Sequence, residues 1–289
     1  MQTRGHFVDV SRRSREGAAD VKLSVQALQQ MKRDGRKIVA VVAYDCQLAA
    51  IAHRAGVDML SVGDSVGINM WGHESEFEIT LEEMILACRG VRRGAPDALV
   101  SCDFPISRLQ DGPGGAVHAA RALVEQGGAD LVKVDGAGTS PHIVQAMTRA
   151  GIPVWAQFGI TPHNAAKYGG MAKAGPELAT AMTEQLVAEA RMLEDAGAAL
   201  LDFTNSGPVA GPAATEAVAI PVIGGLGGGP WLDGRVRMGY AAIGYLASAL
   251  DDGVERYANV ARAALEAFTT LAEDVRAGRQ IKGAPRPKN

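Results

Sequence analysis

Cysteine, basic charge and long apolar runs are all scarce in this chain. The three cysteines, Cys46, Cys88 and Cys102, are widely spaced, which fits neither a disulfide framework nor paired zinc ligands and is typical of a reducing cytoplasm. No apolar run approaches the roughly 18 residues of a membrane span. A net charge of -3 leaves no basic surface for nucleic acid. These absences predict a cytoplasmic protein with no membrane or nucleic-acid partner.

The length of 289 residues, 47% of them hydrophobic, suits one large α/β barrel or two ordinary domains. The first twenty residues carry scattered charge and no continuous apolar stretch, so they do not resemble a secretory signal. The last residues contain proline, glycine and basic side chains. We predict an N-terminal arm over residues 1–20, one domain over 21–280 and a C-terminal tail over 281–289.

Between these ends one unit recurs: a short apolar run, a turn rich in glycine, aspartate or proline, and a helical stretch. Near-continuous apolar runs are typical of strands covered on both faces, as in a parallel sheet wrapped by helices. Eight such units favour a (β/α)8 barrel of the TIM type, with a doubly wound open sheet as the alternative. The strands are predicted to begin near Ile38, Asp58, Ala98, Asp130, Ile152, Ala199, Ile220 and Ala241.

Two helices have clear end signals. Thr80 followed by Glu83 is a capping box for a helix over residues 81–91. A long stretch over residues 177–196, rich in alanine and glutamate, ends before Gly197, which suits a left-handed C-cap. These signals support the division into units.

Three aspartates, Asp64, Asp103 and Asp135, each stand where an apolar run stops. In a barrel the carboxyl ends of the strands converge on one mouth, so these side chains are expected to lie together. A buried carboxylate is costly unless a cation or donors replace its water. Oxygen ligands of this kind favour Mg²⁺ or a similar divalent ion. The sequence therefore predicts a metal site at the mouth, with helix caps or turns as the alternative role of each aspartate.

Lys133 precedes Asp135 by two residues, so both side chains point to the same face of an extended strand. If that face is the barrel interior, the ammonium can bind a substrate carboxylate beside the metal. A lysine that merely neutralises a buried acid is the alternative. Gln157 and the segment 202–205 stand at further strand ends, where Gln157 and Thr204 are expected to contact the substrate.

Two motif matches lack their required context. The segment 63–67 fits G-x-S-x-G, but the next helix cap comes only at Thr80, whereas the hydrolase turn leads directly into a helix. The glycines of residues 224–229 match neither a dinucleotide fingerprint nor a P-loop. Neither segment indicates hydrolase or dinucleotide chemistry, although the backbone amides of the glycine segment could bind a phosphate or a carboxylate.

Several short motifs are linked along residues 21–250: V-A-Y-D at 42–45, V-G-D-S-V-G at 62–67, V-R-R-G-A-P at 91–96, D-F-P at 103–105, L-V-K-V-D-G at 131–136, F-G-I-T-P at 158–162 and I-P-V-I-G at 220–224. In this order they resemble the ketopantoate hydroxymethyltransferase family. The resemblance implies a (β/α)8 barrel of the phosphoenolpyruvate/pyruvate type, usually a homodecamer. It also implies transfer of a one-carbon unit from 5,10-methylenetetrahydrofolate to the small 2-oxo acid 3-methyl-2-oxobutanoate.

Carried over residue by residue, the resemblance places magnesium aspartates at Asp64 and Asp103, with Ser65 touching substrate. The substrate-binding lysine falls on Lys133. A metal-associated glutamate of the family falls on Asp135, one methylene shorter, where a water could bridge the gap.

Three positions depart from the family pattern. The family's glutamate base corresponds to Thr204, a histidine to Gln157, and a His-Asp pair to residues 240–241. Threonine cannot accept a proton near neutral pH. Asp202 lies two residues before Thr204 and should face the same side, which suggests a relocated base. A structural aspartate deeper in the barrel is the alternative.

The remaining residues suit a 2-oxo acid bound through Mg²⁺, with an enolate formed by loss of a C3 proton. Three functions compete. The first is the family's own hydroxymethyl transfer or a related aldol reaction. The second is a different metal-dependent C–C lyase of the phosphoenolpyruvate/pyruvate barrel group. The third is a non-catalytic homologue, which the retained charged residues disfavour because idle buried charges destabilise a fold.

Overall fold

The computed structural model describes residues 22–173 and 175–283, and within them eight parallel strands close into a barrel. Each strand pairs with the next, and the five residues of β8 pair with the five of β1 to close the ring. The predicted (β/α)8 barrel is confirmed, and the open sheet is excluded. The strands are β1 (Ile38–Val42), β2 (Met59–Val62), β3 (Leu99–Asp103), β4 (Leu131–Val134), β5 (Val154–Gly159), β6 (Leu200–Thr204), β7 (Val222–Gly224) and β8 (Gly234–Met238).

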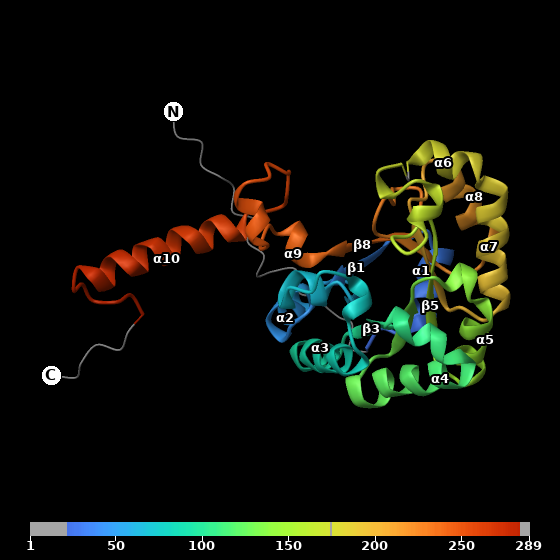
Figure 1. The fold of residues 1–289 in the computed structure, drawn as a ribbon, viewed down its shortest axis with the longest axis horizontal. Coiled ribbons are helices and arrows are strands. Elements are labelled where there is room, and N and C mark those ends of the chain that lie inside the picture. The colour runs from blue at the N-terminus through green and yellow to red at the C-terminus, as the bar shows by residue number, and fades with distance from the viewer. Residues whose placement is uncertain (1–21, 174, 284–289) are drawn as a thin grey trace.

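Helices surround most of the barrel, and short helical turns interrupt several of the loops (Figure 1). The α-helices are α1 (Val25–Arg33), α2 (Cys46–Arg54), α3 (Leu81–Gly94), α4 (Gly112–Ala122), α5 (Pro141–Arg149), α6 (Pro176–Ala181), α7 (Thr183–Asp195), α8 (Ala210–Ala217), α9 (Gly239–Ala242) and α10 (Val260–Arg276). The shorter turns are η2 (Gly67–Trp71), η3 (Glu76–Glu78), η4 (Ile106–Asp111), η5 (Leu123–Gly127), η6 (Ala137–Thr139), η7 (Ala165–Tyr168), η8 (Met171–Lys173) and η9 (Ala247–Leu250).

An apolar layer fills one end of the barrel interior, and α1 closes that end. Leu28 and Met31 of α1 pack onto inward-facing residues of the strands, such as Leu131, Trp155 and Leu200. A separate apolar layer lies between the strands and the outer helices. The barrel is therefore packed and closed at the amino ends of its strands, which leaves the carboxyl ends for binding.

Side-chain alternation places a polar layer directly above the apolar one. Successive side chains of a strand point to opposite faces, so the residue two positions after an inward-facing residue also points inward. Lys133 follows Leu131 in this way, Gln157 follows Trp155, and Asp202 follows Leu200. The same alternation continues from Asp202 to Thr204. Polar side chains on three adjacent strands thus share the barrel interior.

The position predicted for the eighth strand, near Ala241, is wrong. The strand is β8, and residues 239–242 form the short helix α9. Strand β8 alternates buried and exposed residues, with Arg235 and Arg237 facing outward, rather than forming a continuous apolar run. Alternation is expected where one face of a strand meets solvent. A search for continuous apolar runs therefore passed over it.

The predicted cap at Thr80 and the left-handed C-cap at Gly197 are confirmed, but helix α3 continues to Gly94 rather than ending at residue 91. Helix α3 begins with the predicted capping box, in which the Thr80 hydroxyl accepts from the Glu83 amide. Gly197 has φ of +90°, as a left-handed C-cap requires. The stretch 177–196, predicted as one helix, is divided into α6 and α7 at Met182. The hydroxyls of Thr180 and Thr183 donate to backbone carbonyls around this division, a pattern that often bends helices.

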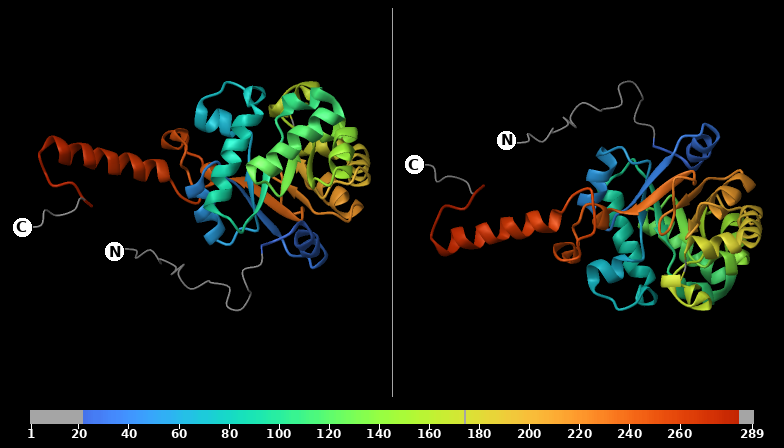
Figure 2. Two further views of the ribbon diagram at one scale, coloured as in Figure 1. Left: turned by 90° about the horizontal axis from the view of Figure 1, so that it is seen from below. Right: turned by 90° about the horizontal axis from the view of Figure 1, so that it is seen from above.

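Helix α10 extends away from the barrel in all three views (Figures 1 and 2). Its apolar side chains Leu265, Phe268 and Leu271 are exposed. No helix among the described residues is long and apolar enough to cross a bilayer. The predicted arm, residues 1–20, and most of the predicted tail, residues 281–289, lie outside the described residues.

Two glycines of α3 make a matched test of packing. A Cβ on Gly94 would lie 2.1 Å from the carbonyl oxygen of Cys46, whereas a Cβ on Gly90 would meet only one atom, at 3.9 Å. We expect Gly94→Ala to destabilise the fold by about 1–3 kcal/mol, because helix α2 must move. Gly90→Ala should stabilise it by about 0.5–1 kcal/mol, because alanine loses less entropy in a helix. Urea unfolding measures the free energy of unfolding of both variants. A change of the same sign in the two variants would contradict this account.

Candidate active site

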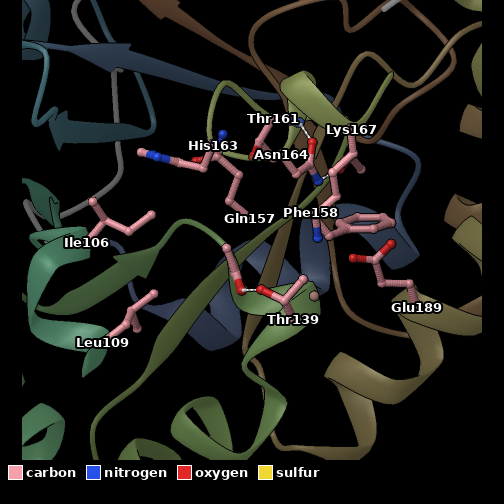
Figure 3. A pocket seen from close by; sticks show the side chains of 13 residues that line it. Ile106, Leu109, Thr139, Gln157, Phe158, Thr161, His163, Asn164, Lys167 and Glu189 are labelled. Atoms are coloured by element: carbon pink, nitrogen blue, oxygen red, sulfur yellow. Dashed lines mark hydrogen bonds between the residues drawn. The ribbon is translucent and has the colours of Figure 1, made fainter. Parts of the chain in front are cut away.

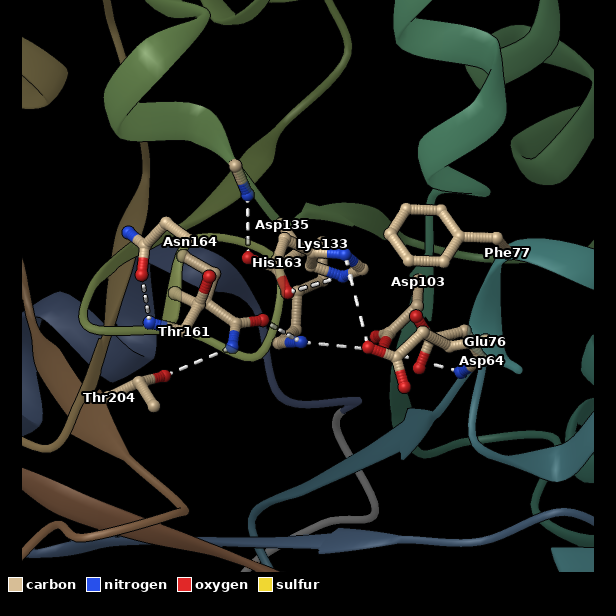
Figure 4. Close-up of polar contacts among 12 residues, drawn as sticks. Asp64, Glu76, Phe77, Asp103, Lys133, Asp135, Thr161, His163, Asn164 and Thr204 are labelled. Carbon is tan, nitrogen blue, oxygen red and sulfur yellow. Dashed lines mark hydrogen bonds and ion pairs between the residues drawn. The ribbon is translucent and has the colours of Figure 1, made fainter. Parts of the chain in front are cut away.

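Lys133 is the centre of a polar network inside the barrel (Figure 4). Its Nζ donates to Gln157 Oε1 at 2.5 Å and to Asp103 Oδ2 at 3.3 Å, and lies 3.7 Å from Asp202 Oδ2. Burial lowers the pKa of Lys133, but the carboxylates of Asp103 and Asp202 outweigh burial and raise the pKa above its usual value. The ammonium is therefore charged at any physiological pH.

Asp64 and Asp103 lie side by side at the ends of β2 and β3. The Asp64 amide donates to Asp103 Oδ2 at 3.4 Å. Burial raises the pKa of Asp64, and it raises the pKa of Asp103 to about 7 although Lys133 opposes the shift. Asp103 Oδ1 is buried and has no hydrogen-bond partner in the described part of the chain. These two carboxylates lack enough positive charge in their surroundings.

The two carboxylates fit a divalent ion, but the three predicted ligands do not form one cluster. No group of three or more acidic, histidine or cysteine side chains in residues 22–173 and 175–283 is arranged to hold a metal. Two carboxylates, with water and substrate in the other positions, are a usual arrangement for Mg²⁺. The orphaned Asp103 Oδ1 supports this arrangement. The direct role predicted for Asp135 stays a prediction.

Asp135 pairs with His163, a residue that the sequence analysis did not select. His163 Nε2 lies 2.8 Å from Asp135 Oδ2, and Nδ1 lies 3.9 Å from Glu76 Oε1. The Phe77 ring packs edge-on against His163, with centroids 5.1 Å apart. Burial lowers the pKa of His163, but Asp135 outweighs it and the pKa is raised. One feature of the sequence could have identified His163 as a site residue: it directly follows the F-G-I-T-P motif, which begins at the end of β5.

Gln157 joins Lys133 to Thr204. Its Oε1 accepts from Lys133, and its Nε2 donates to Thr204 Oγ1 at 3.0 Å. Asp202, on the same strand as Thr204, is buried, and its Oδ1 has no partner in the described structure. Burial raises the pKa of Asp202 to about 6, against the opposing effect of Lys133. Asp202 thus faces the interior, as alternation predicted, and is ionised at neutral pH.

Ser65 lies at the edge of this network. Its hydroxyl is 2.8 Å from the hydroxyl of Tyr44, which also accepts from Asn69 at 3.3 Å. Burial raises the pKa of Tyr44 to about 12, so the phenol stays protonated. The structure therefore connects Asp64, Asp103, Lys133, Gln157, Asp202 and Thr204 in one interior network, with Ser65 and Asp135 beside it.

A pocket adjoins this network and shares Gln157 and His163 with it (Figure 3). The pocket lies among the loops that follow β3, β4 and β5 and is bounded by helix α7. The site as a whole offers a buried cation for an anionic group, two carboxylates for a metal, and one unpartnered carboxylate oxygen that can accept a proton.

Comparison with known proteins gives a consistent result. The family model of ketopantoate hydroxymethyltransferase matches residues 22–280. The 3-methyl-2-oxobutanoate hydroxymethyltransferase of Geobacillus kaustophilus (strain HTA426) is 35% identical over 246 residues, 85% of this chain and 87% of that protein. The enzyme of the same name from Oleidesulfovibrio alaskensis (strain ATCC BAA-1058 / DSM 17464 / G20) is 38% identical over 247 residues, 85% of this chain and 84% of that protein.

Solved structures share the architecture. A 2,3-dimethylmalate lyase of the PEP mutase/isocitrate lyase superfamily has a TM-score of 0.60 at 17% identity and covers 91% of this chain and 92% of its own. A phosphonopyruvate hydrolase in complex with oxalate and Mg²⁺ has a TM-score of 0.57 at 14% identity, covering 92% of this chain and 91% of its own. At these identities the likeness shows the fold alone.

Removing the buried cation tests the network. Lys133→Met should destabilise the protein by about 3–5 kcal/mol at pH 8, because it leaves ionised carboxylates buried without a partner. The loss should be smaller at pH 5, since the raised pKa values of Asp103 and Asp202, about 7 and about 6, make both carboxyls largely neutral there. Urea unfolding at the two pH values measures this, with the exposed Lys173→Met as control. An equal loss at both pH values would contradict it.

Proposed function

This chain belongs to the ketopantoate hydroxymethyltransferase family, and we propose that it adds a one-carbon unit to C3 of a 2-oxo acid such as 3-methyl-2-oxobutanoate. The observation that carries the proposal is the pair of buried carboxylates, Asp64 and Asp103, beside the buried ammonium of Lys133. A 2-oxo acid has a carboxylate and a keto oxygen on adjacent carbons, which suits a site that offers a metal position and a cation together.

Asp64 and Asp103 would hold Mg²⁺. Both are hard oxygen ligands, and the unpartnered Asp103 Oδ1 and the raised pKa of each carboxyl are what a missing cation would leave behind. When bound, the metal supplies Lewis-acid polarisation of the keto oxygen, which makes the C3 proton more acidic. Asp135 would act beside the metal, through its contact with His163, rather than as a third direct ligand.

Lys133 and Gln157 would position the substrate. The Lys133 ammonium faces Asp103 and Asp202 and can add a charge-assisted hydrogen bond to a substrate carboxylate. The short contact with Gln157 holds this ammonium at the centre of the barrel. Thr204, held by Gln157, and Ser65, held by Tyr44, contribute hydroxyl groups to the wall around the substrate.

Asp202 would remove the C3 proton. Thr204, at the position of the family's glutamate, has no proton-accepting capacity at neutral pH. The free Oδ1 of Asp202 and its pKa of about 6 match the requirements for a general base. The nearby Lys133 keeps Asp202 ionised before the reaction and partly offsets the charge of the enolate that forms.

The one-carbon donor would be 5,10-methylenetetrahydrofolate. In the balanced reaction the C3–H bond of the 2-oxo acid breaks and C3 bonds to the methylene carbon. The bonds from that carbon to the donor nitrogens break, and one water supplies the new hydroxyl group. The products are the hydroxymethylated 2-oxo acid and tetrahydrofolate, with no net oxidation or reduction.

A metal-dependent C–C lyase is the second candidate. One observation favours it: the family's glutamate position holds Thr204, which cannot accept a proton near neutral pH. The fold shared with a 2,3-dimethylmalate lyase suggests which substrate to test. Such an enzyme would cleave a substituted malate rather than extend a 2-oxo acid. The homo-oligomer expected from the family resemblance also stays a proposal, and the exposed apolar side chains of α10 are a surface that suits it.

Proton exchange at C3 tests the proposed function without the one-carbon donor. In D₂O with Mg²⁺, the protein should exchange the C3 proton of 3-methyl-2-oxobutanoate, as followed by NMR. Chelation with EDTA, or Asp103→Asn, should reduce exchange at least about 100-fold, because metal polarisation is worth several kcal/mol. The exposed Asp97→Asn should have no effect. Exchange that persists without metal would refute the metal role, and cleavage of 2,3-dimethylmalate without exchange would favour the lyase.

The pH profile of the same exchange tests the base. The rate should fall as pH decreases through about 6, because the protonated carboxyl of Asp202 cannot accept another proton. Asp202→Asn should reduce the rate about 10²- to 10⁴-fold while binding of the 2-oxo acid, measured by calorimetry, is retained. Asp251→Asn, at an exposed position, is the matched control. Full exchange by Asp202→Asn would assign the base elsewhere.

A further inference from the structure

The pocket beside the Lys133 network is lined by the carboxylate of Glu189, from helix α7 (Figure 3). Its Oε1 would lie 1.5 Å from a Cβ built on Gly138, so the carboxylate lies directly over a position that tolerates only glycine. Burial alone raises the pKa of Glu189 to about 7, with no opposing hydrogen bond or cation. Glu189 therefore lines the pocket as an acid without a donor in the described structure.

Two further polar atoms of the pocket are also unsatisfied. Thr161 Oγ1 and His163 Nδ1 are buried and have no hydrogen-bond partner within residues 22–173 and 175–283. Buried polar groups in native proteins nearly always have a partner, and one left without it costs about 1–3 kcal/mol. These two buried atoms and the carboxylate of the half-buried Glu189 give the pocket its polar side.

The rest of the pocket wall suits a flat ring. Ile106, Leu109 and Phe158 line it with apolar surface, and Gly136 adds no side chain on the loop that follows β4. Binding pockets commonly combine apolar walls with a few placed polar groups. The shared residues Gln157 and His163 put this ligand next to the proposed 2-oxo acid.

We propose that this pocket binds the pterin ring of the one-carbon donor, with the carboxylate of Glu189 accepting hydrogen bonds from its N–H edge. The 2-amino group and the adjacent ring N–H of a reduced pterin are two parallel donors, which match the two oxygens of one carboxylate. The inference rests on the proposed function, because a one-carbon donor must lie beside the substrate that receives the carbon. Gly138 is a positioning residue, since a larger side chain there would displace Glu189.

Tetrahydrofolate binding to the full-length protein, measured by calorimetry without a 2-oxo acid, tests the proposal. Glu189→Gln should weaken binding about 10- to 100-fold, because an amide replaces one of the two acceptors with a donor. Gly138→Ala should weaken it as well. Glu184→Gln, at an exposed position on the same helix, should bind like the unaltered protein. Binding by Glu189→Gln that equals that of the unaltered protein would overturn the proposal.

C3 exchange of 3-methyl-2-oxobutanoate separates the two levels of inference. The variants Glu189→Gln, Gly138→Ala and Glu184→Gln should all keep the exchange rate within about twofold of the unaltered protein. Proton exchange needs no one-carbon donor, and Glu189 does not line the Lys133 network. Exchange by the unaltered protein without tetrahydrofolate binding would refute the pterin pocket and leave the enolate chemistry intact. Absence of exchange in the unaltered protein would refute the proposed function itself. Loss of exchange in Glu189→Gln alone would assign Glu189 to the 2-oxo acid instead.

Discussion

The buried ammonium of Lys133 is the interaction on which the site depends. It faces Asp103 and Asp202 at 3.3 Å and 3.7 Å, while Asp64 lies one strand further away. One cation cannot neutralise three acids, and burial raises the pKa of all three. A divalent ion at Asp64 and Asp103 would correct this imbalance. Burial raises the pKa of Asp202 to about 6, so this carboxylate can accept a proton near neutral pH.

The geometry of the barrel strands places these charged side chains in the interior. Alternate residues of each strand point inward, so an apolar layer built on Leu131, Trp155 and Leu200 is followed by a polar layer two residues later. The apolar layer, closed by α1, excludes water from the amino ends of the strands. Electrostatic interactions are stronger in such surroundings than in water, which benefits catalysis and makes an unpaired charge costly. Stability and chemistry therefore constrain the same residues.

Much of the fold and part of the site followed from local pattern. The spacing of apolar runs predicted the barrel, and strand-end placement selected Asp64, Asp103 and Asp135. Two-residue alternation then selected Lys133 beside Asp135 and Asp202 beside Thr204. Strand β8 was missed because one of its faces is exposed, and its alternation differs from that of a strand covered on both sides. His163 was missed because a loop histidine carries no periodic signal, and its partner Asp135 comes from another strand.

The sequence by itself determined which side chains face the barrel interior, because alternation along a strand is a local property of the backbone. It also determined the family, through motifs that are contiguous in the chain. Only the tertiary structure decided which of these side chains meet: Lys133 contacts Asp202 rather than its near neighbour Asp135, and Glu189 reaches Gly138 from a different unit. The reason is that strand register and loop course fix distances between residues far apart in the chain, and no short segment encodes them.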